Sequence, residues 1–235
     1  MKINYCIKKI TQVLSYFLFV LLFACSPEYI PNMINTPMLS NKGEIQGNIA
    51  AGINTIDGQM AIAITDNFAV MTNASYYNRT SDSTNNFHKH ILLEGGLGYY
   101  LKLSDVGRFE VFGGYGLGNV EGYYENSIIG SSITDANFSR FFIQPAIGAS
   151  SQVFDGSFAT RFVFVRMNPN GDNFDTGSYI PFIEPAVTFR LGYKHIKGVM
   201  QVGFSLPISK TNINFDYQPI IFNVGVSYNI WKSYE

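Results

Sequence analysis

The sequence predicts an all-β fold, an antiparallel up-and-down transmembrane β-barrel of about ten strands. The first observation is the stretch from Tyr179 to Tyr193, where apolar residues take every second position and Glu184, Thr188 and Arg190 lie between them. Successive side chains of a strand point to opposite faces, so one face is apolar and the other polar. Tyrosines at both ends of the apolar face are typical of strands that cross a membrane.

The second observation is that the same period recurs in other segments of the chain, each bounded by polar turn residues. In the seventh segment, placing Arg161 inward sends Phe158, Phe162 and Phe164 to the lipid, together with Arg166 at the outer end. The predicted strands are Glu44–Ile53, Gln59–Thr65, Phe68–Asn78, His90–Lys102, Arg108–Tyr123, Phe138–Val153, Ser157–Met167, Tyr179–Tyr193, Gly198–Pro207 and Pro219–Trp231.

The third observation is that short and long connections alternate. Outer-membrane barrels have short periplasmic turns and longer outer loops, and an even strand number puts both barrel ends on the periplasmic side. The first connection, Asn54–Asp57, is a short hairpin on the side of the long ones. The other short connections are Thr65–Asn67, Ser104–Gly107, Asp155–Gly156 and His195–Lys197, and the long ones are Arg79–Lys89, Tyr124–Asn137, Asn168–Ser178 and Ile208–Gln218.

The N-terminus has the pattern of an export signal, which we place at residues 1–24. Three lysines precede an apolar stretch from Ile10 to Phe23 that is short for a membrane-spanning helix. Leu22-Phe23-Ala24-Cys25 resembles a bacterial lipobox, which predicts lipidation of Cys25; the alternative is ordinary cleavage beside an incidental thiol. Residues 25–43, with three prolines, are expected to form an extended tether before the barrel at 44–235.

Composition restricts the functional classes. The formal net charge is −1, which gives no footprint for nucleic acid. After export Cys25 would be the sole cysteine, so we predict neither an internal disulfide nor a cysteine-based metal site. No cofactor or metal is predicted.

A set of charged and amide side chains falls on the predicted inner face, where a small barrel is largely filled by side chains. Carboxylates there must be paired. Two interpretations stay open: a structural plug of Glu–Arg pairs and amide hydrogen bonds, or a substrate path lined with charges. The predicted lumen residues are Glu94, Glu110, Gln144, Arg161, Glu184, Arg190 and Gln201, and Arg140 falls on the same face.

A short repeat places proline twice at the same local position. Phe142-Ile-Gln-Pro145-Ala-Ile recurs as Phe182-Ile-Glu-Pro185-Ala-Val, and proline cannot donate to a strand ladder. We expect either a bulge or bend that is used twice or a coincidence of similar strands.

The last strand carries Asn223, Gly225, Tyr228 and Ile230, which resemble the C-terminal signal that the barrel-assembly machinery engages. With the lipobox, the chain thus resembles small outer-membrane β-barrel proteins of Gram-negative bacteria that begin with a lipoprotein signal. The resemblance implies the outer membrane as location, with lipid and the assembly machinery as partners. The implied role is structural, surface-interacting or porin-like narrow transport, and not enzymatic.

Two alternatives remain. One is a lipid-tethered soluble barrel that binds an apolar ligand, as lipocalins do. The other is an outer-membrane lipid-acyl enzyme that uses His88 or His90, with Ser81, Asp82 and Ser83 in the adjacent loop.

Overall fold

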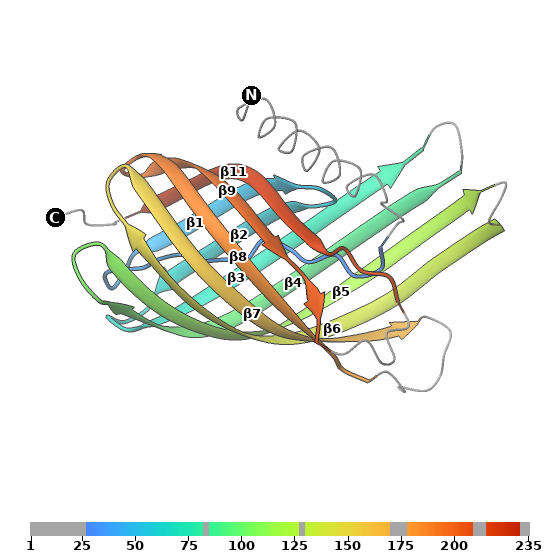
Figure 1. Ribbon diagram of the computed structural model, residues 1–235, viewed down its shortest axis with the longest axis horizontal. Helices are drawn as coiled ribbons and strands as arrows, with labels where there is room; N and C mark the ends of the chain where they lie inside the picture. The colour runs from blue at the N-terminus through green and yellow to red at the C-terminus, as the bar shows by residue number, and fades with distance from the viewer. Residues whose placement is uncertain (1–26, 82–84, 127–129, 170–177, 209–214, 231–235) are drawn as a thin grey trace, which may run out of the picture.

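The computed structural model describes residues 27–81, 85–126, 130–169, 178–208 and 215–230, which form one closed antiparallel barrel (Figure 1). Neighbours in the chain are neighbours in the barrel from β1 to β9, and β11 closes it between β9 and β1. The strands are β1 (Ile45–Gly52), β2 (Ile56–Ala63), β3 (Phe68–Thr80), β4 (Phe87–Lys102), β5 (Gly107–Asn126), β6 (Gly130–Ser150), β7 (Phe154–Pro169), β8 (Ile180–Tyr193), β9 (Ile196–Phe204), β10 (Leu206–Pro207) and β11 (Ile220–Ile230).

The two-residue β10 continues β9 and is not a separate wall strand. Both pair with β8 in one register, with Gly203 opposite Ala186 and Leu206 opposite Ile183. The barrel therefore has ten strands in up-and-down order, as the sequence predicted.

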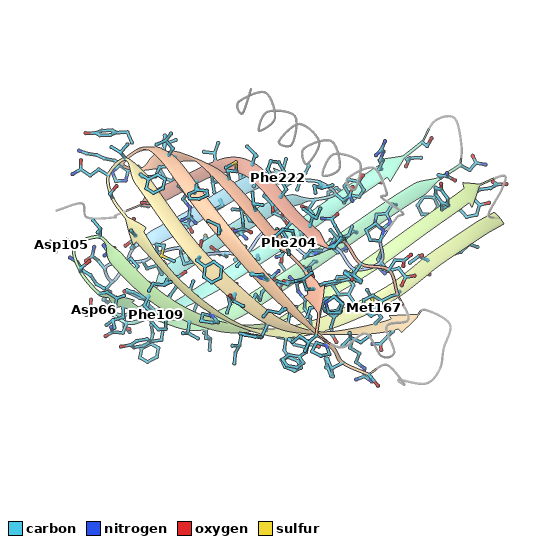
Figure 2. The ribbon with its side chains drawn as sticks, viewed as in Figure 1. Asp66, Asp105, Phe109, Met167, Phe204 and Phe222 are labelled. Atoms are coloured by element: carbon cyan, nitrogen blue, oxygen red, sulfur yellow. The ribbon has the colours of Figure 1, made fainter. Side chains whose placement is uncertain are left out.

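The strands alternate in exposure because each has one inner and one outer face. In β9, Lys197, Val199 and Gln201 are buried, whereas Met200 and Val202 between and beside them are exposed. Arg161 of β7 is fully buried, while Phe158 points outward, so β7 has the orientation that places Arg161 inward. Apolar side chains such as those of Phe109, Phe204 and Phe222 surround the barrel (Figure 2).

Two of the predicted long loops, Arg79–Lys89 and Tyr124–Asn137, have wrong bounds, because the flanking strands extend into them from both sides. β5 and β6 pair without a break from Gly107 opposite Ala149 to Asn126 opposite Gly130, and β3 pairs with β4 as far as Thr80 opposite Phe87. The polar side chains there break the apolar alternation, but the ladder bonds are made by the main chain. Both hairpins therefore extend past the other strands on one side (Figure 1).

The repeated prolines interrupt ladders without shifting them. Thr160 of β7 lies opposite Pro185, and the β6–β7 ladder skips the position of Pro145 while keeping one register on both sides. A β-bulge would insert a residue and change the register. The expected bulge is therefore absent at both prolines.

The tether region is the main departure from expectation. Residues 29–39 are all buried and pass through the barrel, as the blue chain in Figure 1 shows. We call Tyr29–Leu39 the lumenal segment. It runs from the end with the extended hairpins, the long-loop end, to the short-turn end, where β1 begins.

Contacts at both ends fix this direction. At the long-loop end, Tyr29 forms a parallel bridge with Tyr217 of the β10–β11 connection. At the short-turn end, Arg108, the second residue of β5, donates to the hydroxyl of Ser40 at 2.8 Å. β1 starts at the short-turn end as expected, but Pro27 lies at the opposite end of the barrel.

Candidate functional site in the barrel lumen

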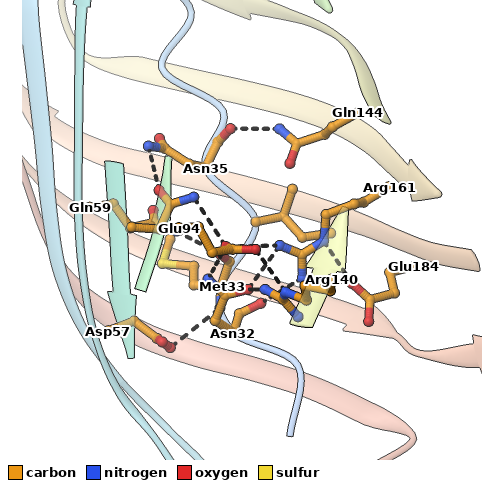
Figure 3. A network of polar contacts seen from close by, with 12 residues as sticks. Asn32, Met33, Asn35, Asp57, Gln59, Glu94, Arg140, Gln144, Arg161 and Glu184 are labelled. Carbon is orange, nitrogen blue, oxygen red and sulfur yellow. Dashed lines mark hydrogen bonds and ion pairs between the residues drawn. The ribbon is translucent and has the colours of Figure 1, made fainter. Parts of the chain in front are cut away.

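The centre of the lumen is a cluster of charged side chains arranged around Asn32 (Figure 3). Arg140 pairs with Glu94 at 2.7 Å, and Arg161 pairs with Glu184 at 2.6 Å. All four side chains are fully buried. Burial of such charges is tolerated only where each has a partner.

Asn32 of the lumenal segment joins the two ion pairs. Its amide nitrogen donates to Glu94 at 2.8 Å, while its side-chain oxygen accepts from both Arg140 and Arg161. An amide can satisfy a carboxylate and two guanidinium groups together because it carries both a donor and an acceptor. Asn32 therefore completes the polar network from the centre of the barrel.

Tyr29 makes a second connection from the same segment. Its hydroxyl donates to Glu184 at 2.9 Å and accepts from Arg140 at 2.7 Å. Its ring packs against Phe138, Phe182 and Phe215 in an apolar cluster toward the long-loop end. This end of the segment is therefore held by both polar and apolar contacts.

The main chain of the segment is also paired with wall side chains. The side-chain oxygen of Gln201 accepts a hydrogen bond from the N–H of Ile34 at 2.7 Å, and its side-chain nitrogen donates one to the carbonyl of Ile34 at 2.8 Å. Gln59 donates to the carbonyl of Met33 at 2.6 Å. Two wall carboxylates accept hydrogen bonds from main-chain N–H groups, Asp57 from Met33 and Glu110 from Met38. Three wall side chains donate hydrogen bonds to main-chain carbonyls, Gln144 to Asn35, Arg161 to Asn32 and Arg190 to Thr36.

The apolar side chains of the segment lie against small wall residues. Ile34 and Met38 share a cluster with three alanines of the wall and Ile221, and Met33 packs with Ala50 and Val199. The alanines are Ala146, Ala159 and Ala186. Small side chains on the wall leave room in the lumen for the larger ones of the segment.

Glu28 lies at the long-loop mouth, outside the strands. Its carboxylate accepts from the hydroxyl of Thr134 on β6 at 3.4 Å. Partial burial raises the pKa of this carboxyl, although the hydrogen bond acts in the opposite direction. Glu28 therefore marks the point where the chain enters the lumen.

The structure brings the predicted lumen residues together. Glu94, Glu110, Gln144, Arg161, Glu184, Arg190 and Gln201 are all buried, and each makes a hydrogen bond to the region between residues 29 and 38. They do not simply pair with one another across an empty barrel. Each of them has at least one partner in the segment that the sequence analysis treated as a tether.

The residues that the sequence analysis missed are Tyr29 and Asn32 of the segment and Asp57 and Gln59 of the wall. Asp57 was placed in a turn, but it is an inward residue of β2 that accepts from Asn223 at 2.7 Å. One signal was present: no residue between Glu28 and Lys42 carries a charge. A solvated linker is usually richer in charge, so this run indicates burial.

The two histidines of β4 face the lumen near the long-loop end. His90 is buried and stacks on Phe138 with ring centroids 5.6 Å apart. Ser81 is described, whereas Asp82 and Ser83 lie outside the described residues. The acyl-enzyme alternative therefore stays an untested prediction.

The predicted assembly residues lie on β11, which closes the barrel against β1. Asn223 is buried, and Tyr228 is exposed on the outer face opposite Gly47. Gly225 pairs with Ala50, and Ile230 pairs with Ile45 at the first position of β1. Cys25 lies outside the described residues.

Among the described residues, no group of three or more His, Cys, Asp or Glu side chains is placed to hold a metal ion. Within the same ranges no helix has the length and apolar character needed to cross a bilayer. No protein-family model matches the chain, and neither does any curated protein. The class that the structure defines is a closed ten-stranded β-barrel whose interior is polar and occupied by its own N-terminal region.

Proposed function

We propose that this protein is an outer-membrane barrel of a Gram-negative bacterium, sealed by its lumenal segment, that acts as a membrane-embedded scaffold for its extended hairpins. Loops and hairpins carried by a rigid barrel are suited to surface interactions. The observation that supports this proposal best is the combination of an apolar outer face with a charged, filled interior.

The outer face supports a membrane location. Leu97 and Ile49 are each 71% exposed, Leu191 is 66% exposed, and further apolar side chains surround the barrel on every long strand. Soluble monomers rarely expose apolar patches larger than a few hundred Å². A surface of this kind is suited to the hydrocarbon core of a bilayer.

Aromatic side chains at the short-turn end add to this support. Phe68 and Tyr99 lie opposite each other beside the β2–β3 turn, with ring centroids 5.6 Å apart. Phe154 and Tyr193 flank two other turns and are exposed. Aromatic girdles of this kind mark the membrane–water interface in outer-membrane barrels.

The lumen supports a sealed barrel in preference to open transport or apolar-ligand binding. A lipocalin-like barrel would keep an apolar interior and a polar exterior, which is the reverse of the distribution here. The lumenal segment lies where an open path would have to run, and many of its hydrogen bonds are with charged and amide groups of the wall. We therefore favour a sealed scaffold over an open channel and over a barrel that binds an apolar ligand.

The membrane assignment is tested by folding. We expect the purified chain to fold only with detergent or lipid and to migrate faster on a gel when it is not heated. A chain that forms a monodisperse folded monomer in plain buffer would contradict the assignment.

Sealing is tested in planar bilayers with the full-length protein. We expect insertion to leave the conductance close to that of the bare membrane, because the lumenal segment occupies the path. Long-lived channel openings by the heat-modifiable, folded protein would show that the lumen conducts.

A further inference from the structure

The barrel wall contacts the lumenal segment mainly through atoms that any peptide would offer. Between residues 32 and 38, eight main-chain groups hydrogen-bond to seven wall side chains. These side chains are Asp57, Gln59, Glu110, Gln144, Arg161, Arg190 and Gln201. The wall side chains come from six different strands, β2 and β5 to β9.

Gln201 shows this recognition most clearly. Its amide pairs with both the N–H and the carbonyl of Ile34, as a neighbouring strand would. The Gln201 amide is itself oriented by its bond to the hydroxyl of Thr188 at 2.7 Å. The wall therefore offers fixed hydrogen-bonding partners to an extended main chain.

Side-chain selectivity is confined to a few positions. Met33, Ile34 and Met38 contact mostly alanine and valine side chains, which set size but little chemistry. The side chains of Tyr29, Asn32 and Thr36 meet charged partners, and that of Asn35 donates a hydrogen bond to Asn73. An uncharged extended peptide with a tyrosine and an amide residue three positions apart satisfies the contacts with Glu94, Arg140, Arg161 and Glu184.

We propose that the lumen is a binding site for an extended, uncharged peptide that is recognised chiefly through its main chain, with the lumenal segment as the ligand supplied by the same chain. The inference rests on the sealed lumen of the proposed function and is independent of membrane location. It implies that the segment stays bound when its covalent link to β1 is cut, and that a peptide of the same sequence can replace it.

The test uses the full chain with a specific protease site in place of Asn41 and Lys42, in the turn before β1, where Lys42 is exposed. After cleavage of the folded barrel, we expect the N-terminal fragment to stay bound through size-exclusion chromatography. Immediate loss of the fragment from a barrel that stays heat-modifiable would overturn the peptide site and leave the membrane assignment intact.

A pair of matched wall substitutions separates main-chain recognition from general weakening of the barrel. Gln201→Met removes both bonds to Ile34, and we expect the cleaved fragment to dissociate at least about tenfold faster. Gln46→Met is the control, because buried Gln46 bonds to Asn48 and Ser227 of the wall. Equal fragment release in the two variants would contradict the proposal.

A second arm uses synthetic peptides of residues 27–41 during refolding of the cleaved chain. A labelled peptide in tenfold excess should replace most of the original fragment. A peptide with an ester in place of the amide at Ile34 lacks the N–H that donates to Gln201, so it should compete about tenfold less well. An ester at Leu39, whose N–H makes no hydrogen bond to the described wall, should compete like the natural peptide, and equal competition by both esters would refute main-chain recognition.

Discussion

The carboxylate of Glu184 illustrates how single residues hold the interior together. It accepts hydrogen bonds from Tyr29, Arg161 and Ser205, which belong to the lumenal segment, β7 and the junction between β9 and β10. Removing one partner of a buried ion pair leaves an uncompensated charge, which costs far more than an exposed pair contributes.

We expect Glu184→Ala to lower the free energy of unfolding by about 3–5 kcal/mol, because Arg161 loses its nearest carboxylate. The measurement is urea unfolding of the barrel folded in lipid vesicles. The control is Glu121→Ala, which removes an exposed pair with Lys89 and should cost less than about 1 kcal/mol. Similar losses in both variants would show that the lumen network contributes nothing special.

The inward placement of Glu184 and of Arg161 could be predicted, because strand alternation alone decides which face a side chain takes. Their partners in the lumenal segment could not be predicted. Tyr29 and Glu184 are 155 positions apart, and no local pattern links a residue of an apparent tether to one on β8. The sequence did hold one cue, since no residue from Tyr29 to Asn41 is charged, but the extended-tether prediction did not use it.

At the scale of elements, large rings on one strand lie opposite glycines on the next. Phe138 of β6 pairs with Gly118 of β5, and Phe112 of β5 pairs with Gly98 of β4. In each pair, a Cβ atom on the glycine would overlap the ring. The inward glycines therefore give the rings space against the wall beside the lumenal segment.

We expect Gly118→Ala to destabilise the barrel by about 1–3 kcal/mol, because the Phe138 ring must leave its position. Gly95→Ala is the control, since a Cβ atom there has no heavy atom within 4 Å. Thermal unfolding in detergent compares the two variants. If Gly118→Ala and Gly95→Ala unfold at the same temperature, the glycine–ring pairing has no energetic role.

Strand number, order and facing followed from the period-two pattern, whereas strand ends did not. The pattern stops where a strand leaves the apolar belt, but the main-chain ladder continues, as in β5 beyond Tyr123 and β6 before Phe138. Backbone pairing without side-chain alternation has no signature in a single sequence. The long-loop side was therefore predicted as loop where the structure has extended hairpins.

At the scale of the whole molecule, the lumenal segment determines which end of the barrel faces the N-terminus. Fully extended, the twelve residues from Glu28 to Leu39 reach at most about 40 Å, enough to cross a hydrocarbon core of about 30 Å. Pro27 lies at the long-loop end, although β1 begins at the short-turn end.

An engineered disulfide checks the path of the segment through the barrel. The hydroxyls of Thr36 and Ser157 are 2.9 Å apart, so Thr36→Cys with Ser157→Cys should crosslink under mild oxidation. Thr36→Cys with Thr160→Cys should not, because Thr160 lies on the other face of β7. Both pairs are made in a chain that also carries Cys25→Ser. If neither pair crosslinks, the segment lies elsewhere.

Accessibility of the N-terminus checks its direction. An epitope inserted directly before Pro27 should be reached by antibody from the same side of a vesicle as one inserted at residues 127–129. An epitope in the turn at residues 103–106 should be reached from the opposite side. Co-localisation of the Pro27 epitope with the 103–106 epitope would reverse the direction.

A chain that occupies its own lumen also constrains the order of assembly. The segment is joined covalently to β1 at one end, and a lipidated or folded group at its other end could not pass through a finished, filled ring. With such a group in place, the pairing of β11 with β1 would have to be completed while residues 29–39 already lie between the strands. Barrel closure would then be the last event, and it would take place around the protein's own extended N-terminal region.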